Sequence, residues 1–136
     1  MDTKEITERM ARGLNPSGES KAGLFGVLAT GETVEIGYAD DVYELLGEVD
    51  KTSLNLVGIA ITTTGWAAPL NPETGEVEGR PSEHAQRRRV MLVALATADE
   101  IMSAVRFADD DEITHDTNGT GALAFALREA FERVVA

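Results

Sequence analysis

The side chains best suited to chemistry gather in one segment, residues 65–89, whose sequence is GWAAPLNPETGEVEGRPSEHAQRRR. This segment contains the only tryptophan of the chain, one of its two histidines and a run of consecutive arginines. Guanidinium groups stay charged and bind phosphate or carboxylate through paired hydrogen bonds. An imidazole can accept or donate a proton at neutral pH. The segment is therefore the first candidate for a binding surface.

The candidate contacts with a ligand or partner in this segment are Trp66, Arg80, His84, Arg87 and Arg89. In a regular strand alternate side chains share a face, so Arg87 and Arg89 would project together and Arg88 would project to the other side. The alternative is that the arginines pair with surface carboxylates, and such exposed ion pairs contribute little to stability. For Trp66 the alternatives are an exposed interaction anchor and a core side chain folded back over the sheet.

The sequence predicts neither nucleophilic catalysis nor a metal site. Ser82 and His84 are close together, but the GxSxG pattern that exposes a catalytic serine is absent. His115 and Asp116 follow an acidic run, yet the chain has no HxH or HxxxH spacing and no cysteine, which are the usual local signs of metal binding. We expect no catalytic residue, no metal and no cofactor.

Glycine patterns at two places match parts of nucleotide-binding motifs. Residues 119–124, GTGALA, match GxGxxA and open a helix, but a dinucleotide fold also needs a preceding strand and an acidic residue about twenty positions later. Residues 13–18, GLNPSG, have the glycine spacing of a phosphate loop, but Glu19 occupies the position where lysine is required. Neither pattern predicts a nucleotide site.

Hydrophobic periodicity predicts the helices and strands that must position these residues. Helices are expected at residues 3–12, 41–49 and 120–135, each with an apolar stripe at helical spacing. Strands are expected at residues 24–30, 33–38, 54–64, 88–97 and 101–107. Alternation predicts Val34, Ile36 and Tyr38 on one buried face. The apolar run 88–97 predicts a central strand that is covered on both faces.

We therefore expect one α+β domain over residues 1–136, with about five mostly antiparallel strands and flanking helices. After an N-terminal helix the element order is β-β-α-β-β-β-α, and a long loop occupies about residues 65–87. Loops of this length are uncommon and often functional, and the alternative is a dispensable surface insertion. The element order resembles that of small sensor folds such as PAS, GAF and profilin-like domains. This resemblance concerns order alone and implies no function.

The strings GWAAP at residues 65–69 and PSEHAQRRRV at residues 81–90 resemble a group of uncharacterised small proteins from actinobacteria. These motifs are not diagnostic of any known chemistry. The resemblance therefore implies no activity and no functional residue.

Composition and charge exclude several classes of protein. The chain has no cysteine, which excludes disulfides and thiol catalysis and permits a reducing compartment. Its formal net charge is −12, with 24 acidic against 12 basic residues, and this balance repels nucleic acids and anionic lipids. No apolar run has the pattern of a signal sequence or a membrane span. We expect a cytoplasmic protein without direct contact with nucleic acid or membrane.

The leading hypothesis is a non-catalytic binding or interaction module that contacts a protein partner through residues 65–89 and forms a homodimer. The first alternative is an enzyme or sensor that binds a small anionic ligand, with Arg87 or Arg89 holding the anion and His84 moving a proton. The second alternative is an acidic decoy of a nucleic-acid-binding protein, motivated by the net charge and the acidic run at residues 109–112. The decoy hypothesis predicts that the acidic residues share one face of the molecule.

Overall fold

The helices and strands follow the predicted order closely. The structure is a computed structural model that describes residues 2–14, 21–48, 55–67, 88–107, 112–117 and 122–135. Its helices are α1 (Thr3–Gly13), α2 (Val42–Glu48) and α3 (Ala122–Val134). Its strands are β1 (Ala22–Leu28), β2 (Thr33–Ala39), β3 (Leu56–Ala67), β4 (Arg88–Thr97), β5 (Ile101–Phe107) and β6 (Ile113–Asp116).

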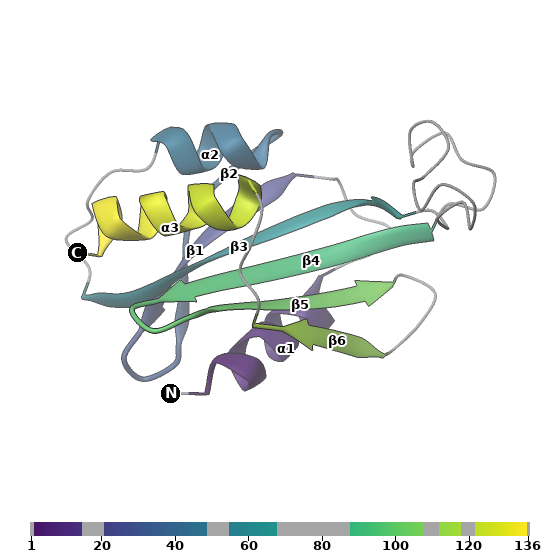
Figure 1. The fold of residues 1–136 in the computed structure, drawn as a ribbon, viewed down its shortest axis with the longest axis horizontal. Coiled ribbons are helices and arrows are strands. Elements are labelled where there is room, and N and C mark those ends of the chain that lie inside the picture. The colour runs from purple at the N-terminus through teal and green to yellow at the C-terminus, as the bar shows by residue number, and fades with distance from the viewer. Residues whose placement is uncertain are drawn as a thin grey trace.

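The described strands form one antiparallel sheet in the order β2-β1-β3-β4-β5-β6 (Figure 1). Helices α2 and α3 pack side by side on one face of the sheet, and α1 packs on the opposite face. The predicted α+β class, with a helix at each end, is confirmed. The sheet has one strand more than predicted, because Ile113–Asp116 pairs with β5 as an edge strand. None of the helices described is long and apolar enough to cross a membrane.

The turns set where the first strands begin and end. β1 ends two residues earlier than the predicted strand 24–30, because the chain turns directly after Leu28. The amide of Gly31 donates to the carbonyl of Leu28 at 2.8 Å. Gly31 has a φ of +89°, a left-handed conformation that glycine adopts without steric strain. The strands β4 and β5 begin and end at the predicted residues, and the Thr97 amide closes their turn by donating to the Glu100 carbonyl at 2.9 Å.

A bulge in β2 corrects the predicted buried face of this strand. The register with β1 shifts between Leu24 and Phe25, which leaves Ile36 as an extra residue on β2. Val34 and Ile36 pack against the core on the α2–α3 side, as predicted. Tyr38 is 52% exposed, because the extra residue moves it to the opposite face of the sheet. The prediction that Tyr38 shares the buried face is therefore wrong.

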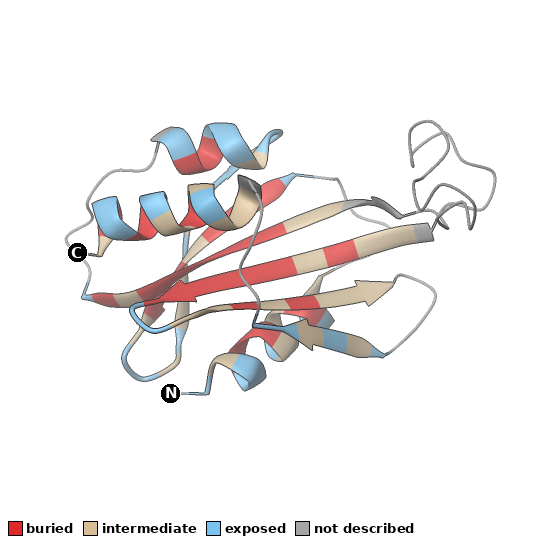
Figure 2. Cartoon of the chain, viewed as in Figure 1, coloured by how far each residue is buried: buried red, intermediate tan, exposed pale blue. Residues whose placement is uncertain are grey.

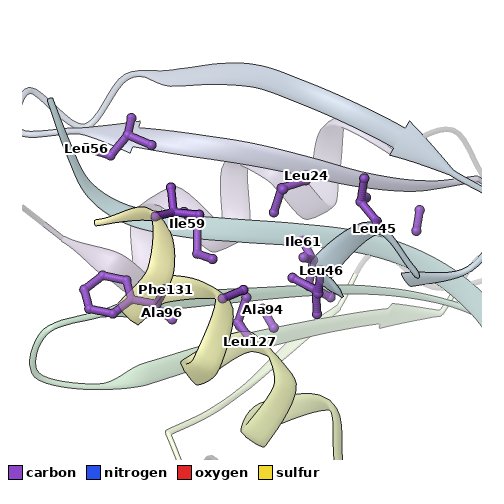
Figure 3. Packing of buried hydrophobic residues seen from close by; sticks show 13 residues of the cluster. Leu24, Leu45, Leu46, Leu56, Ile59, Ile61, Ala94, Ala96, Leu127 and Phe131 are labelled. Carbon is purple, nitrogen blue, oxygen red and sulfur yellow. The ribbon is translucent and has the colours of Figure 1, made fainter. Parts of the chain in front are cut away.

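The larger hydrophobic core lies between the sheet and the layer formed by α2 and α3 (Figure 2). The predicted apolar stripe of α3 is confirmed, since its Leu127 and Ala130 are fully buried. Leu46 of α2 is buried beside this stripe (Figure 3). The sheet residues beneath the helices include Leu24, Ile59, Ile61, Ala94 and Ala96.

Helix α1 covers the opposite face. It begins at Asp2, whose carboxylate accepts the amides of Lys4 and Glu5 at 3.1 Å and 3.2 Å and so caps the helix. Ile6 and Met10, the predicted apolar contact of this helix, pack against the sheet. These contacts hold α1 against the sheet, where it packs chiefly on β4 and β5.

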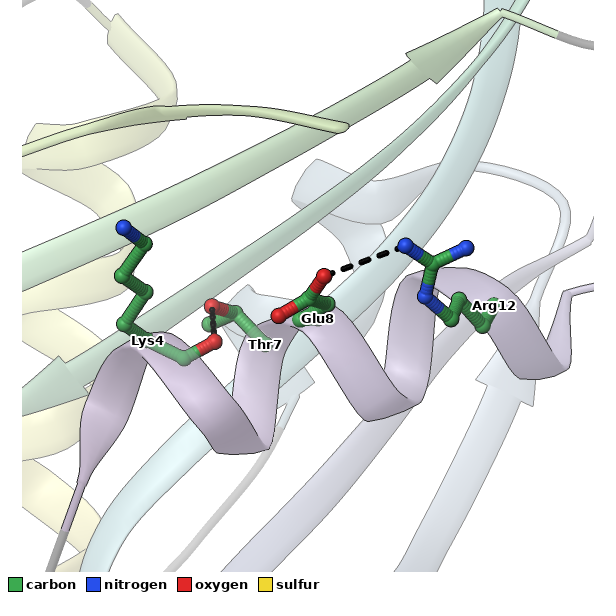
Figure 4. Close-up of polar contacts among 4 residues, drawn as sticks. All are labelled: Lys4, Thr7, Glu8 and Arg12. Atoms are coloured by element: carbon green, nitrogen blue, oxygen red, sulfur yellow. Dashed lines mark hydrogen bonds and ion pairs between the residues drawn. The ribbon is translucent and has the colours of Figure 1, made fainter. Parts of the chain in front are cut away.

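Thr7 and Arg12 of α1 have hydrogen-bond partners within the helix itself (Figure 4). The hydroxyl of the buried Thr7 donates back to the helix backbone, 3.0 Å from the carbonyl oxygen of Lys4. On the exposed side Arg12 forms an ion pair with Glu8 at 3.1 Å. The helix therefore presents an apolar side to the sheet and a charged side to solvent.

β4 is the central strand that the sequence predicts. It lies between β3 and β5, and buried side chains alternate on both of its faces. Val93 and Leu95 project toward the α1 side, whereas Ala94 and Ala96 project toward α2 and α3. A strand that is covered on both faces gives a rigid base for any residue at its end.

Candidate functional site

β3 and β4 pair beyond the end of β1 and form what we call the arm, residues 63–67 and 88–92. Among the described residues, β1 pairs with β3 as far as Thr62. The register between β3 and β4 continues to the pair Ala67 and Arg88 (Figure 1). Residues 65–67 therefore belong to a strand, whereas the sequence predicted that the loop starts at residue 65.

The arm brings two of the sequence-predicted contact residues together. Trp66 on β3 and Arg89 on β4 are direct partners in the register, although the whole segment 67–88 separates them along the chain. Arg80, His84 and Arg87 lie outside the described residues. The structure thus places Trp66 and Arg89 at one position of the sheet.

Arg89 lies on the sheet face that carries α1. Its Nη2 donates to the Thr64 hydroxyl oxygen at 3.2 Å. Both residues alternate in register with residues that pack on the α1 side, Ala60 on β3 and Val93 on β4. The side chain of Arg89 is only partly exposed, so its position is fixed by the strands around it.

Two further basic residues occupy the same face on the next two strands. Arg106 of β5 pairs with Met91 of β4, and His115 of β6 pairs with Ala104 of β5. Arg106 is therefore diagonal to Arg89, and His115 is diagonal to Arg106. Diagonal neighbours on one sheet face lie about 7–8 Å apart. We call Arg89, Arg106 and His115 the basic row.

Arg106 also contacts the end of α1. Its Nη2 donates to the carbonyl oxygen of Leu14 at 2.7 Å, and Leu14 is the residue that caps the helix at its C-terminus. The C-terminal end of a helix carries partial negative charge and stabilises a nearby cation. This bond holds the guanidinium of Arg106 between α1 and β5.

Sequence reasoning missed Arg106 and considered His115 only as a metal ligand. The signal for Arg106 was its place within the half-apolar strand Ile101–Phe107, where a charged residue needs a polar partner. No local sequence pattern predicts that Arg106 or His115 lies near Arg89, because their proximity depends on the registers of three strands. The sequence instead grouped Arg89 with His84, which is nearer along the chain.

The arginines on the other face of the sheet have structural partners. Arg128 donates to the carbonyl of Thr97, and its guanidinium lies 5.2 Å from the ring centroid of Phe131. Arg133 donates from Nη2 to the Leu46 carbonyl at 2.6 Å and so joins α3 to the end of α2. Across the described ranges, no three histidine, aspartate or glutamate side chains gather in a way that could hold a metal ion.

Comparison with known proteins finds no match to this chain among protein-family models, curated proteins or solved structures.

Proposed function

We propose that the protein is a non-catalytic binding module whose arm, together with the segment that joins its two strands, contacts a protein partner. The observation that carries the proposal is the register pairing of Trp66 with Arg89. Tryptophan and arginine are enriched among the side chains that dominate the binding energy of protein interfaces. Their placement on adjacent strands offers both residue types to one partner.

The local charge supports the same surface. Residues 80–89 contain four arginines and one glutamate, so this stretch of the sequence is basic although the whole chain has a net charge of −12. A basic patch of this kind steers an acidic partner surface and fixes its orientation. We therefore propose a partner with an acidic patch.

Partner capture from a lysate of the source cells, with identification by mass spectrometry, tests the proposal. Trp66→Ala and Arg87→Ala should each reduce the amount of the captured partner about tenfold, the loss expected when an interface anchor is truncated. Tyr43→Ala is the matched control, because Tyr43 is an aromatic residue of α2 that is 49% exposed, and α2 packs on the face of the sheet opposite to Arg89. Unchanged capture by both arm variants, or an equal loss in the control, would contradict the proposal.

We also propose a cytoplasmic location and a homodimer. The cysteine-free sequence, which suits a reducing compartment, supports the location. Tyr43 and Phe125 support the dimer, because these aromatic side chains of α2 and α3 are 49% and 67% exposed. Exposed aromatic residues are enriched in subunit interfaces.

The acidic-decoy hypothesis gains no support from the described carboxylates. Glu5 and Glu8 lie on α1, whereas Glu129 and Glu132 lie on α3. These helices cover opposite faces of the sheet, so these four acidic residues do not share one face. A surface that mimics nucleic acid needs its charges together.

A further inference from the structure

We infer that the protein partner binds by adding an extended acidic segment, as a new strand, to the open side of β3 in the arm. Along residues 64–67, β3 pairs with β4 on one side, and among the described strands it has no neighbour on the other side. We call this open side of residues 64–67 the arm edge. The inference rests on the proposed function and specifies how the arm holds its partner.

The backbone of the arm edge lacks a pairing strand. In an antiparallel pair, alternate residues direct their N–H and C=O groups toward the neighbouring strand, and the residues between them direct theirs to the opposite side. β1 pairs with these outer groups of β3 only as far as Thr62. Within the described part of the chain, no turn or loop bonds to the backbone of residues 64–67. An extended segment binds such an edge through main-chain hydrogen bonds.

The other described edges of the sheet carry features that discourage pairing with another chain, and the arm edge has none of them. Native edge strands are guarded by charged residues, proline or bulges. β2 has the bulge at Ile36 and the exposed Glu35, and β6 ends with the exposed Asp116. Residues 63–67, TTGWA, include no charged residue and no proline, and their register with β4 continues without a shift. The arm edge is therefore a template for pairing.

The charge beside the arm edge favours an acidic segment. The Nη2 of Arg89 donates to the Thr64 hydroxyl at 3.2 Å, so this guanidinium extends from β4 across β3 toward the arm edge. A strand added to β3 lies about 4.8 Å from it, and alternate side chains of that strand share the face that carries Arg89. Carboxylates at these alternate positions complement the positive charge. A second copy of this chain fits less well, because pairing two arm edges would bring two Arg89 side chains together.

Amide hydrogen exchange of the full ¹⁵N-labelled chain, followed by nuclear magnetic resonance, tests whether the arm edge is open. Amides of residues 58–61, which lie between β1 and β4, should exchange slowly. Among residues 64–67, the amides that point away from β4 should exchange rapidly. Slow exchange of all four amides in dilute solution would show that the chain covers its own edge, and slow exchange only at high concentration would show that a second copy covers it. Either result would overturn the inference.

A synthetic peptide, acetyl-Val-Asp-Val-Asp-Val-amide, is the probe for strand addition, since valine favours strands and the aspartates share one face. The amide signals of residues 64–67 should shift saturably with this peptide, and the rapidly exchanging amides should become protected. The amides of β2 should not move. Absence of a saturable shift at the arm edge would overturn the inference.

Two altered peptides separate the contributions of charge and backbone. The peptide with lysine in place of both aspartates should bind at least about tenfold more weakly, because its charge has the same sign as Arg89. The acidic peptide with N-methyl groups on all its internal amides should not bind, because its backbone donors are gone. Equal affinity of the lysine peptide would overturn the assignment to an acidic segment, and equal affinity of the methylated peptide would overturn strand addition.

Thr64→Glu is the matching variant of the protein, because it places a carboxylate at the arm edge beside Arg89. It should bind the acidic peptide about tenfold more weakly than the wild type. Thr114→Glu is the control, since Thr114 is an exposed threonine of the edge strand β6, and it should bind the peptide as the wild type does. Unchanged affinity in a folded Thr64→Glu chain would overturn the inference. If this variant does not fold, the wild-type titrations decide.

The peptide titrations and the capture experiment fail independently. Loss of the captured partner in Trp66→Ala, combined with no peptide binding, would overturn strand addition and leave the proposed partner surface standing. Unchanged capture in both arm variants, combined with saturable peptide binding, would contradict the proposed surface while supporting an open edge that accepts a strand.

Discussion

At the scale of single residues, Tyr38 shows how one extra residue in a strand changes the surroundings of a side chain. Its ring makes an edge contact with the ring of Phe25, with 6.1 Å between the centroids. Its hydroxyl donates to the carboxylate of Glu35 at 2.8 Å. This bond raises the pKa of Tyr38, because donation to a carboxylate favours the protonated phenol. Partial burial and the negative charge of Glu35 raise the pKa further.

The raised pKa predicts how the stability of the protein depends on pH. A phenol whose folded pKa exceeds its unfolded value of 10.0 stabilises the fold fully below that value. The stabilisation is lost as the pH rises through the folded pKa. In a Tyr43→Phe background, Tyr38 is the only tyrosine, and its ultraviolet absorbance reports its ionisation.

Adding Glu35→Gln to this background should lower the midpoint of the Tyr38 titration toward the ordinary value. Circular dichroism at each pH serves as the control that the chain remains folded. Identical midpoints with Glu35 and with glutamine would show that the hydrogen bond does not set the pKa of Tyr38.

At the scale of elements, β3 and β4 approach each other closely at the end of the pair opposite to the arm. Gly58 lies near the start of β3, opposite Thr97. A Cβ atom at Gly58 would lie 2.8 Å from the carbonyl oxygen of Ala96, which belongs to the backbone of β4. A backbone oxygen in a central strand cannot move without disturbing the pairing on both sides. Gly58 is therefore required for the close approach of the two strands.

Gly58→Ala should lower the free energy of unfolding by roughly 1–3 kcal/mol, the usual cost of overpacking a core. Gly47→Ala is the matched control, since Gly47 lies in α2 and has no atom within 4 Å of the added Cβ. The control should be neutral or stabilising by up to about 1 kcal/mol, because alanine favours helix. Urea denaturation measures both. Equal stability of Gly58→Ala and the wild type would contradict the observed contact.

At the scale of the whole molecule, those helices and strands could be predicted whose hydrophobic pattern lies within a single segment of the sequence. The apolar runs of β4 and β5 and the apolar stripe of α3 define their elements without reference to distant residues. β6 could not be predicted in this way, because Ile113–Asp116 is short and contains one apolar residue. Its strand conformation depends on pairing with β5, which a local pattern does not reveal.

The candidate site could be predicted only in part for the same reason. Trp66 and Arg89 stood out by residue type, but their register pairing depends on the exact alignment of β3 with β4. Arg106 and His115 join Arg89 through two further registers. A shift of one residue in either register would move a side chain of the row to the other face. Residue type therefore identified Trp66 and Arg89, whereas Arg106 and His115 could be added only from the registers of the sheet.

The central claim is that the arm is the surface that binds a protein partner. Site-specific photo-crosslinking in intact cells tests it most directly. A photoreactive phenylalanine analogue replaces Trp66 in one variant and replaces Tyr43 or Phe125 in the control variants, all of which keep an aromatic side chain at the position. The account predicts a covalent adduct to a protein other than this chain at Trp66, whereas Tyr43 and Phe125 should crosslink only to a second copy of this chain. Adducts to a different protein at Tyr43 or Phe125 and none at Trp66 would contradict it.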